Sequence, residues 1–159
     1  MIGSRGRDLI RIAEGLRLVP YLCPAGRPTI GYGHTRGVTM EHPPLTVVGA
    51  LAYLEEDLAV VEAAINHYVH VALTASMRDA LASWVFNLGE GLFRVSTMLK
   101  VLNAGRYTDV PAEISKWVYS HDKSGQPVRL PGLVVRREDE AELFMADGLP
   151  QEYATPTKE

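Results

Sequence analysis

The sequence predicts a mainly helical α+β protein, and three observations carry that prediction. Three prolines and several strand-forming residues between residues 17 and 36 exclude a helix there and favour a small β-hairpin. Apolar residues recur at spacings of three and four between residues 47 and 65, which is typical of one long amphipathic helix. Capping and stop signals divide the rest of the chain into shorter helices.

In chain order, Ser4 is expected to cap a first helix at about residues 5–15, with Glu14 on its last turn. A hairpin lobe at about residues 14–44 follows, and a connecting helix is expected at about residues 46–68. These elements would place Glu14 where the first helix meets the hairpin.

A helical lobe is expected at about residues 72–148, with one helix capped by Thr74, one that starts at Ser96 or Thr97, and another that begins near Pro111. The last helix is predicted at residues 133–146. Loops are expected at residues 89–91, at residues 120–132 and from Pro150 onward.

Length and composition favour one domain, residues 1–159, with an apolar fraction of 47%. A formal charge of -3 gives no global field that would attract a polyanion, so no nucleic-acid partner is expected. The single cysteine excludes an intramolecular disulfide, which suits folding in a reducing cytosol. The N-terminal segment does not resemble a signal peptide, and the longest apolar run, at about residues 45–54, is too short to span a bilayer.

Residues 14–34, EGLRLVPYLCPAGRPTIGYGH, bring a carboxylate, a thiol, a hydroxyl and an imidazole around a tight turn. A helix-end Glu is usually a solvated surface group, but a positioned and partly desolvated carboxylic acid can act as a general acid. Thr29 and His34 each have an ordinary structural interpretation, as a strand residue and as a hydrogen-bonded histidine. Cys23 can be an inert small residue, a metal ligand or a reactive thiol, and the absence of a ligand-spaced cluster disfavours the metal.

This stretch resembles the active-site segment of the phage-type lysozymes, the endolysin family that includes the T-even phage lysozyme. The family pattern places Glu, then Asp or Cys, then Thr, then Ile-Gly-x-Gly-His at the spacing that this sequence shows. Three later segments also resemble the family in order: LTASMRDALASWVFNLGEGLF, STMLKVLNAG and PGLVVRREDEAELF. The resemblance implies a lysozyme-like α+β fold with an active-site cleft between the hairpin lobe and the helical lobe.

The resemblance further implies an inverting muramidase that hydrolyses the β-1,4 bond between N-acetylmuramic acid and N-acetylglucosamine in peptidoglycan. Glu14 would be the general acid, while Thr29 and Cys23 would hold the attacking water. The residues implied to bind the glycan are Tyr32, Thr35, Phe86, Asn87 and Ser96. The residues implied to support the site are His34, Arg136 and Arg137. No metal or cofactor is implied.

The departure from the commoner pattern is Cys23, because glycoside hydrolysis normally uses two carboxylates. Its thiol could be a thiolate that supports the water and the developing positive charge, or a neutral hydrogen-bond partner. Three alternatives stay open: a cysteine amidase or peptidase with Cys23 as nucleophile and His34 as base, a lytic transglycosylase that uses Glu14 without water, and an inactive wall-binding module.

As an endolysin of a phage or prophage, the protein is expected to be a monomer that acts on host peptidoglycan. With no signal or anchor recognised, we expect it to accumulate in the host cytoplasm and to reach the wall through a membrane lesion made by a holin.

Overall fold

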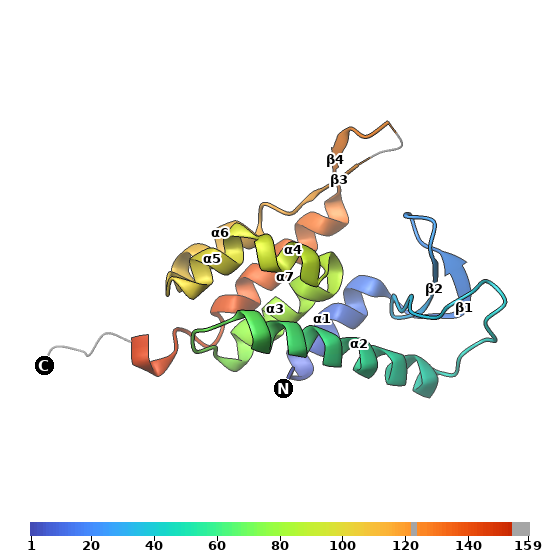
Figure 1. Ribbon diagram of the computed structural model, residues 1–159, viewed down its shortest axis with the longest axis horizontal. Helices are drawn as coiled ribbons and strands as arrows, with labels where there is room; N and C mark the ends of the chain where they lie inside the picture. Colours follow the sequence, from blue (N-terminus) through green and yellow to red (C-terminus); the bar gives the residue numbers. More distant parts are fainter. Residues whose placement is uncertain (122–123, 154–159) are drawn as a thin grey trace, which may run out of the picture.

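The computed structural model, which describes residues 1–121 and 124–153, is mainly helical with two small antiparallel hairpins (Figure 1). This confirms the predicted fold class. Among the described residues, no helix combines the length and apolar character needed to cross a membrane. The elements are α1 Ser4–Glu14, β1 Arg17–Leu22, β2 Pro28–Gly31, α2 Val47–Tyr68, α3 Ala75–Leu88, α4 Glu90–Val95, α5 Thr97–Asn103, η1 Tyr107–Asp109, α6 Val110–Ile114, β3 Tyr119–His121, β4 Pro127–Arg129, α7 Pro131–Met145 and η2 Gln151–Tyr153.

Helix α3 is the centre of the helical part, since α1, α2 and α7 all pack against it. Its sequence is apolar or small around almost the whole circumference, which is typical of a helix buried on all sides. Trp84 near its C-terminal end is fully buried and meets the Trp117 ring edge-to-face at 5.3 Å. The last turn of α3, which contains Phe86 and Asn87, is therefore packed against the core.

The predicted cap Thr74 is confirmed, and the helix expected to start at Ser96 or Thr97 is capped by Ser96. The side chain of Thr74 accepts a hydrogen bond from the backbone N–H of Met77, and that of Ser96 accepts one from Leu99. The predicted cap of α1 is wrong, because Ser4 lies inside the helix. The carboxylate of Asp79 on α3 instead accepts hydrogen bonds from the first turn of α1, from the N–H groups of Gly3 and Gly6.

Two predicted loops contain regular structure. Residues 90–95 form α4 directly after α3, because Gly89 takes a positive φ of 85° and turns the chain into a new helix. The segment expected as a loop at residues 120–132 contains β4 and part of β3, paired in register from Tyr119 opposite Arg129 to His121 opposite Pro127. Both strands are exposed on both faces, so no apolar alternation marks them in the sequence.

The hairpin β1–β2 lies at the end of α1, and β3–β4 extends from the helical part on the same side of the molecule (Figure 1). A backbone bridge between Ile30 and His34 closes the turn after β2. Helix α2 runs from the hairpin side along the helical part and buries the stripe of Leu54, Leu58 and Ile65. Beyond Pro150, Gln151–Tyr153 form a 3₁₀ turn, and the rest of the expected loose tail lies outside the described residues.

Candidate active site

A cleft of about 670 Å³ lies between the two hairpins and the end of α3. Glu14 reaches it from α1, and the predicted residues Cys23 and Thr29 reach it from the first hairpin. A smaller hollow of about 250 Å³ adjoins it, because the two share Gly33, Thr35 and Phe86. The residues lining the cleft are Glu14, Tyr21, Cys23, Pro24, Ala25, Arg27, Thr29, Gly33, Thr35, Phe86, Asn87, Ser120 and His121.

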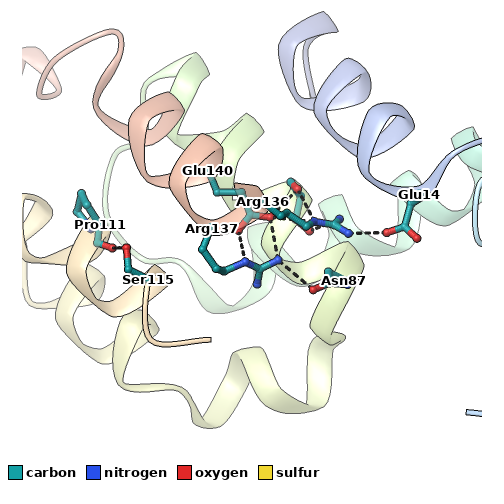
Figure 2. Close-up of polar contacts among 8 residues, drawn as sticks. Glu14, Asn87, Pro111, Ser115, Arg136, Arg137 and Glu140 are labelled. Carbon is teal, nitrogen blue, oxygen red and sulfur yellow. Dashed lines mark hydrogen bonds and ion pairs between the residues drawn. The ribbon is translucent and has the colours of Figure 1, made fainter. Parts of the chain in front are cut away.

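Glu14 is the last residue of α1, and its side chain is 22% exposed. Its Oε1 accepts a hydrogen bond of 2.7 Å from Nη1 of Arg136, a contact that joins the two ends of the sequence (Figure 2). No hydrogen bond reaches its Oε2 from the residues that the structure describes. One carboxyl oxygen is thus held by the protein, and the other remains for a ligand.

Gly33 provides the close approach that Glu14 requires. Its φ is +82°, and a Cβ placed there would lie 3.1 Å from Oε2 of Glu14. Both the left-handed backbone and the short distance favour glycine at this position. The turn after β2 therefore sets the room available around the second carboxyl oxygen.

Arg136 belongs to a buried cluster centred on Glu140, one turn further along α7 (Figure 2). The Nε of Arg136 lies 3.2 Å from Oε1 of Glu140, and the same oxygen accepts a hydrogen bond of 2.6 Å from the hydroxyl of Ser83. Glu140 is completely buried, and burial raises the pKa of its carboxyl. The neighbouring arginines and Ser83 oppose that shift by favouring the charged form.

Arg137 is the second arginine on Glu140 and is also fully buried. Its Nε lies 3.0 Å from Oε2 of Glu140, and its Nη2 donates to Oε1 at 3.1 Å and to Oδ1 of Asn87 at 2.9 Å. Burial lowers the pKa of Arg137 to about 10, which leaves it a cation at neutral pH. One buried carboxylate thus anchors two arginines, and each arginine holds a different residue of the cleft.

Cys23 and Thr29 lie on the opposite side of the cleft, on the hairpin. The hydroxyl of the buried Thr29 donates to the carbonyl of Arg27 at 2.9 Å, and its proton can turn instead to the sulfur of Cys23. The backbone N–H of Arg27 is the main cause of a lowered Cys23 pKa, with smaller contributions from the Ala25 N–H, the Thr29 hydroxyl and the Arg27 charge. The local structure therefore favours the thiolate more than free cysteine does.

His34 lies outside the cleft lining and connects the hairpin to α2. Its Nδ1 lies 2.8 Å from Oδ2 of Asp57, and its Nε2 lies 3.0 Å from the carbonyl oxygen of Arg36. The ring also stacks on Tyr53 with 4.2 Å between centroids. Both ring nitrogens of His34 therefore have partners outside the cleft lining.

Of the five residues expected to bind glycan, Thr35, Phe86 and Asn87 line the cleft, whereas Tyr32 and Ser96 do not. Tyr32 is buried in the core and its ring faces the guanidinium of Arg11, because the left-handed Gly31 and Gly33 turn the chain on either side of it. The hydroxyl of Ser96 is used in capping α5 and in a bond to the Phe93 carbonyl. The structure thus brings three of the five expected residues to the cleft that contains Glu14.

Sequence reasoning missed several residues of the site. Ser120 and His121 reach the cleft from β3, and Glu140 organises the two arginines. The one available signal was Glu140 at spacings of four and three from Arg136 and Arg137, which places opposite charges on one helix face. Across residues 1–121 and 124–153, no group of three or more His, Cys, Asp or Glu side chains could hold a metal ion.

The protein is a small helical protein with a β-hairpin at one end and a cleft that contains the carboxylic acid of Glu14. Residues 11–140 match the phage lysozyme family, and the chain belongs to that family. The chain is 44% identical over 143 residues to an endolysin of Acyrthosiphon pisum secondary endosymbiont phage 1, covering 90% of this chain and 97% of that protein.

Two further comparisons agree with this membership. The chain is 35% identical to the SAR-endolysin of Enterobacteria phage P21, over 90% of this chain and 82% of that protein. The solved muramidase domain of SpmX from Asticaccaulis excentricus superposes with a TM-score of 0.85 at 37% identity, covering 91% of this chain and 97% of that one. The similarity therefore extends through the hairpin, the connecting helix and the helical part alike.

Proposed function

We infer that the protein is a phage endolysin with muramidase activity, a glycoside hydrolase that cuts the β-1,4 bond between N-acetylmuramic acid and N-acetylglucosamine. Family membership and the high coverage of endolysin and muramidase relatives support this inference. The bacterial cell wall is accordingly its place of action. We further propose that residues 1–159 work as one catalytic domain.

The observation that carries the catalytic proposal is Glu14 in the cleft, with Oε1 held by Arg136 and Oε2 left for a ligand. In the proposed step, Oε2 gives its proton to the glycosidic oxygen as the bond to the anomeric carbon breaks. The guanidinium of Arg136 stabilises the carboxylate that remains after this transfer. Arg136 thereby supports the product of the proton transfer and fixes the orientation of the acid.

On the other face of the sugar, we propose that Thr29 and Cys23 hold the attacking water, which gives inversion at the anomeric carbon. Among the described residues lining the cleft, Glu14 is the sole carboxylic acid, so a second carboxylate is missing from this set. In the thiolate form, Cys23 accepts the hydrogen bond of the water and takes its proton as the new carbon–oxygen bond forms. The hydroxyl oxygen of Thr29 fixes the position of that water.

The amidase or peptidase alternative has little geometric support. As predicted, it uses His34 as the base for Cys23, whereas both nitrogens of His34 are bonded to Asp57 and Arg36. The wall-binding and transglycosylase alternatives differ from hydrolysis in their products. One digestion of purified peptidoglycan distinguishes the muramidase from all three alternatives.

In that experiment, the muramidase proposal predicts new reducing ends and muropeptides that have gained one water each. Anhydro-muramyl products would identify a transglycosylase, new free amines would identify an amidase or peptidase, and an undigested wall with bound protein would identify a binding module. Glu14→Gln protein digested in parallel separates activity of this chain from that of a contaminant.

We also propose that the protein acts as a monomer and is released to the wall by a holin-type lesion of the host membrane. The support is its similarity to endolysins, although relatives named SAR-endolysins make the route of release worth measuring directly. Expression in a bacterium with and without a co-expressed holin tests it. Lysis that begins without the holin would refute the proposal, and sedimentation of the purified protein tests the monomer.

A further inference from the structure

The contact between Arg137 and Asn87 determines which end of an amide faces the cleft. Nη2 of Arg137 lies 2.9 Å from Oδ1 of Asn87 (Figure 2). An arginine side chain can only donate hydrogen bonds, so the amide oxygen, and not the NH₂ group, must face it. The orientation of Asn87 therefore follows from the chemistry of its partner.

Arg137 is itself held in place. Its guanidinium is fully buried, and Glu140 binds it through Nε and Nη2 at 3.0 and 3.1 Å. Glu140 is in turn fixed by Ser83 and Arg136. A rotation of the Arg137 guanidinium would break contacts in a site that water does not reach, so the donor facing Asn87 is preorganised.

Asn87 lines the cleft, and with its oxygen bound to Arg137, its NH₂ group is the end left for a ligand. We propose that Arg137 is a positioning residue that holds Asn87 as a hydrogen-bond donor, which selects the acetyl carbonyl oxygen of an N-acetylated sugar. This inference rests on the proposed muramidase function and extends it to the substrate's acetylation state.

The choice of the acetyl group follows from hydrogen-bond polarity. Sugar hydroxyl groups both donate and accept, so they would not distinguish an NH₂ from an oxygen. The acetyl carbonyl oxygen only accepts, and removal of the acetyl group leaves an ammonium that only donates. A donor at Asn87 therefore matches the acetylated sugar and opposes the de-N-acetylated one.

Asn87→Asp tests this polarity because it is nearly isosteric and keeps an oxygen for Arg137. It replaces the donor toward the cleft by an acceptor. The measurement is kcat/KM on peptidoglycan and on the same peptidoglycan after chemical de-N-acetylation. We expect the wild type to prefer the acetylated wall by about tenfold or more, and Asn87→Asp to lower or reverse that ratio, the change that a hydrogen bond to a charged group allows.

Asn66→Asp is the matched control. Asn66 on α2 also accepts from an arginine through Oδ1, at 2.8 Å from Nη1 of Arg78, but it does not line the cleft. The substitution adds the same charge beside an arginine. The preference for the acetylated over the de-N-acetylated wall should stay that of the wild type. If Asn87→Asp also keeps the wild-type ratio, the proposed polarity is wrong.

Arg137→Lys tests the positioning role, since it keeps a cation beside Glu140 but loses the fork that reaches Asn87. We expect a smaller ratio of kcat/KM on acetylated peptidoglycan to kcat/KM on de-N-acetylated peptidoglycan. The change should come from a higher KM on the acetylated wall, with kcat on that wall nearly unchanged. A folded Arg137→Lys protein with the full ratio would overturn the role of Arg137.

A measurement on the wild type does not depend on that variant folding. The NMR signals of the Asn87 NH₂ group, assigned by their absence in Asn87→Asp, should move when an N-acetylglucosamine oligosaccharide binds, and unmoved signals would contradict the proposal. If the wild type cleaves acetylated and de-N-acetylated peptidoglycan equally, the proposed selection of the acetyl group is wrong but the muramidase function stands. If it cleaves neither, the muramidase function is wrong.

Discussion

Glu14 and Arg136 are joined by a hydrogen bond of 2.7 Å although they lie 122 positions apart in the chain. The first helix supplies the acid, and the last helix supplies the guanidinium that orients it. Arg136 is 6% exposed, so its charge is poorly screened by water. The relative positions of α1 and α7 are therefore part of the proposed catalytic geometry.

Glu14→Gln should lose nearly all activity, by roughly 10²- to 10⁴-fold, because an amide cannot give a proton to the glycosidic oxygen. Its carbonyl oxygen can still accept from Arg136, so the melting temperature should change little. Release of reducing ends from peptidoglycan measures the effect. Substantial cleavage by a folded Glu14→Gln protein would rule out the proposed acid.

Gly33→Ala should lower activity more than Gly26→Ala does. Both glycines have positive φ values, +82° and +74°, so both substitutions carry a backbone cost of about 1–2 kcal/mol. Only the methyl group at position 33 would meet Oε2 of Glu14, whereas nothing lies within 4 Å of the one at position 26. Equal activity of the two variants, compared at matched stability, would show that this contact has no catalytic importance.

Cys23→Ser should lose part of the activity and change its pH dependence. The pKa of Cys23 is lowered, chiefly by the N–H of Arg27, so the thiolate forms at lower pH than in free cysteine. If the thiolate accepts the proton of the water, wild-type activity rises as this group ionises, and the serine variant lacks that rise.

The ionisation of Cys23 can be followed directly by thiolate ultraviolet absorbance, because the chain has a single cysteine. Its midpoint should coincide with the rise in wild-type activity. An alkylated protein that keeps the full rate would show that Cys23 only fills space.

Asp147→Asn should weaken the dependence of stability on acid pH. The hydrogen bond from Arg5, followed by one from the N–H of Ser76, lowers the pKa of Asp147 to about 2, whereas an unfolded aspartate has a pKa of about 3.9. Because the pKa of Asp147 is lower in the folded state than in the unfolded state, its ionisation stabilises the folded protein at pH values above about 4. That contribution to stability is lost as the pH falls from about 4 to about 2. Melting temperatures of the two proteins should differ near pH 6 and converge near pH 2, and parallel curves would contradict this.

Asp57→Ala should destabilise the hairpin side of the cleft. It removes the partner of Nδ1 in His34, whose side chain is 4% exposed, and an unsatisfied buried polar group costs about 1–3 kcal/mol. Denaturant unfolding measures the loss. The exposed neighbour Glu56 provides the control, because Glu56→Ala removes a carboxylate from the same helix without touching His34.

Features that depend on neighbouring residues could be predicted from the sequence. Threonine or serine before an apolar run caps a helix within three residues, as Thr74 and Ser96 do. Prolines exclude a helix and glycines permit turns with positive φ, which is why the first hairpin was predictable. The resemblance placed Glu14, Cys23 and Thr29 together, and the structure brings all three to one cleft.

Tertiary structure decided what depends on distant partners. Asp79 caps α1 from another helix, and Tyr32 turns into the core because the glycines around it bend the chain. The hairpin β3–β4 has no apolar alternation because neither face is buried.

The sequence by itself determined the longer helices, the first hairpin and the spacing from Glu14 to Thr29, because caps, apolar periodicity and restricted backbones act over a few residues. Only the folded structure decided that Glu140 holds Arg136 and Arg137, and that these orient Glu14 and Asn87. The physical reason is that a buried charge requires partners, and those partners come from whichever helices pack around it.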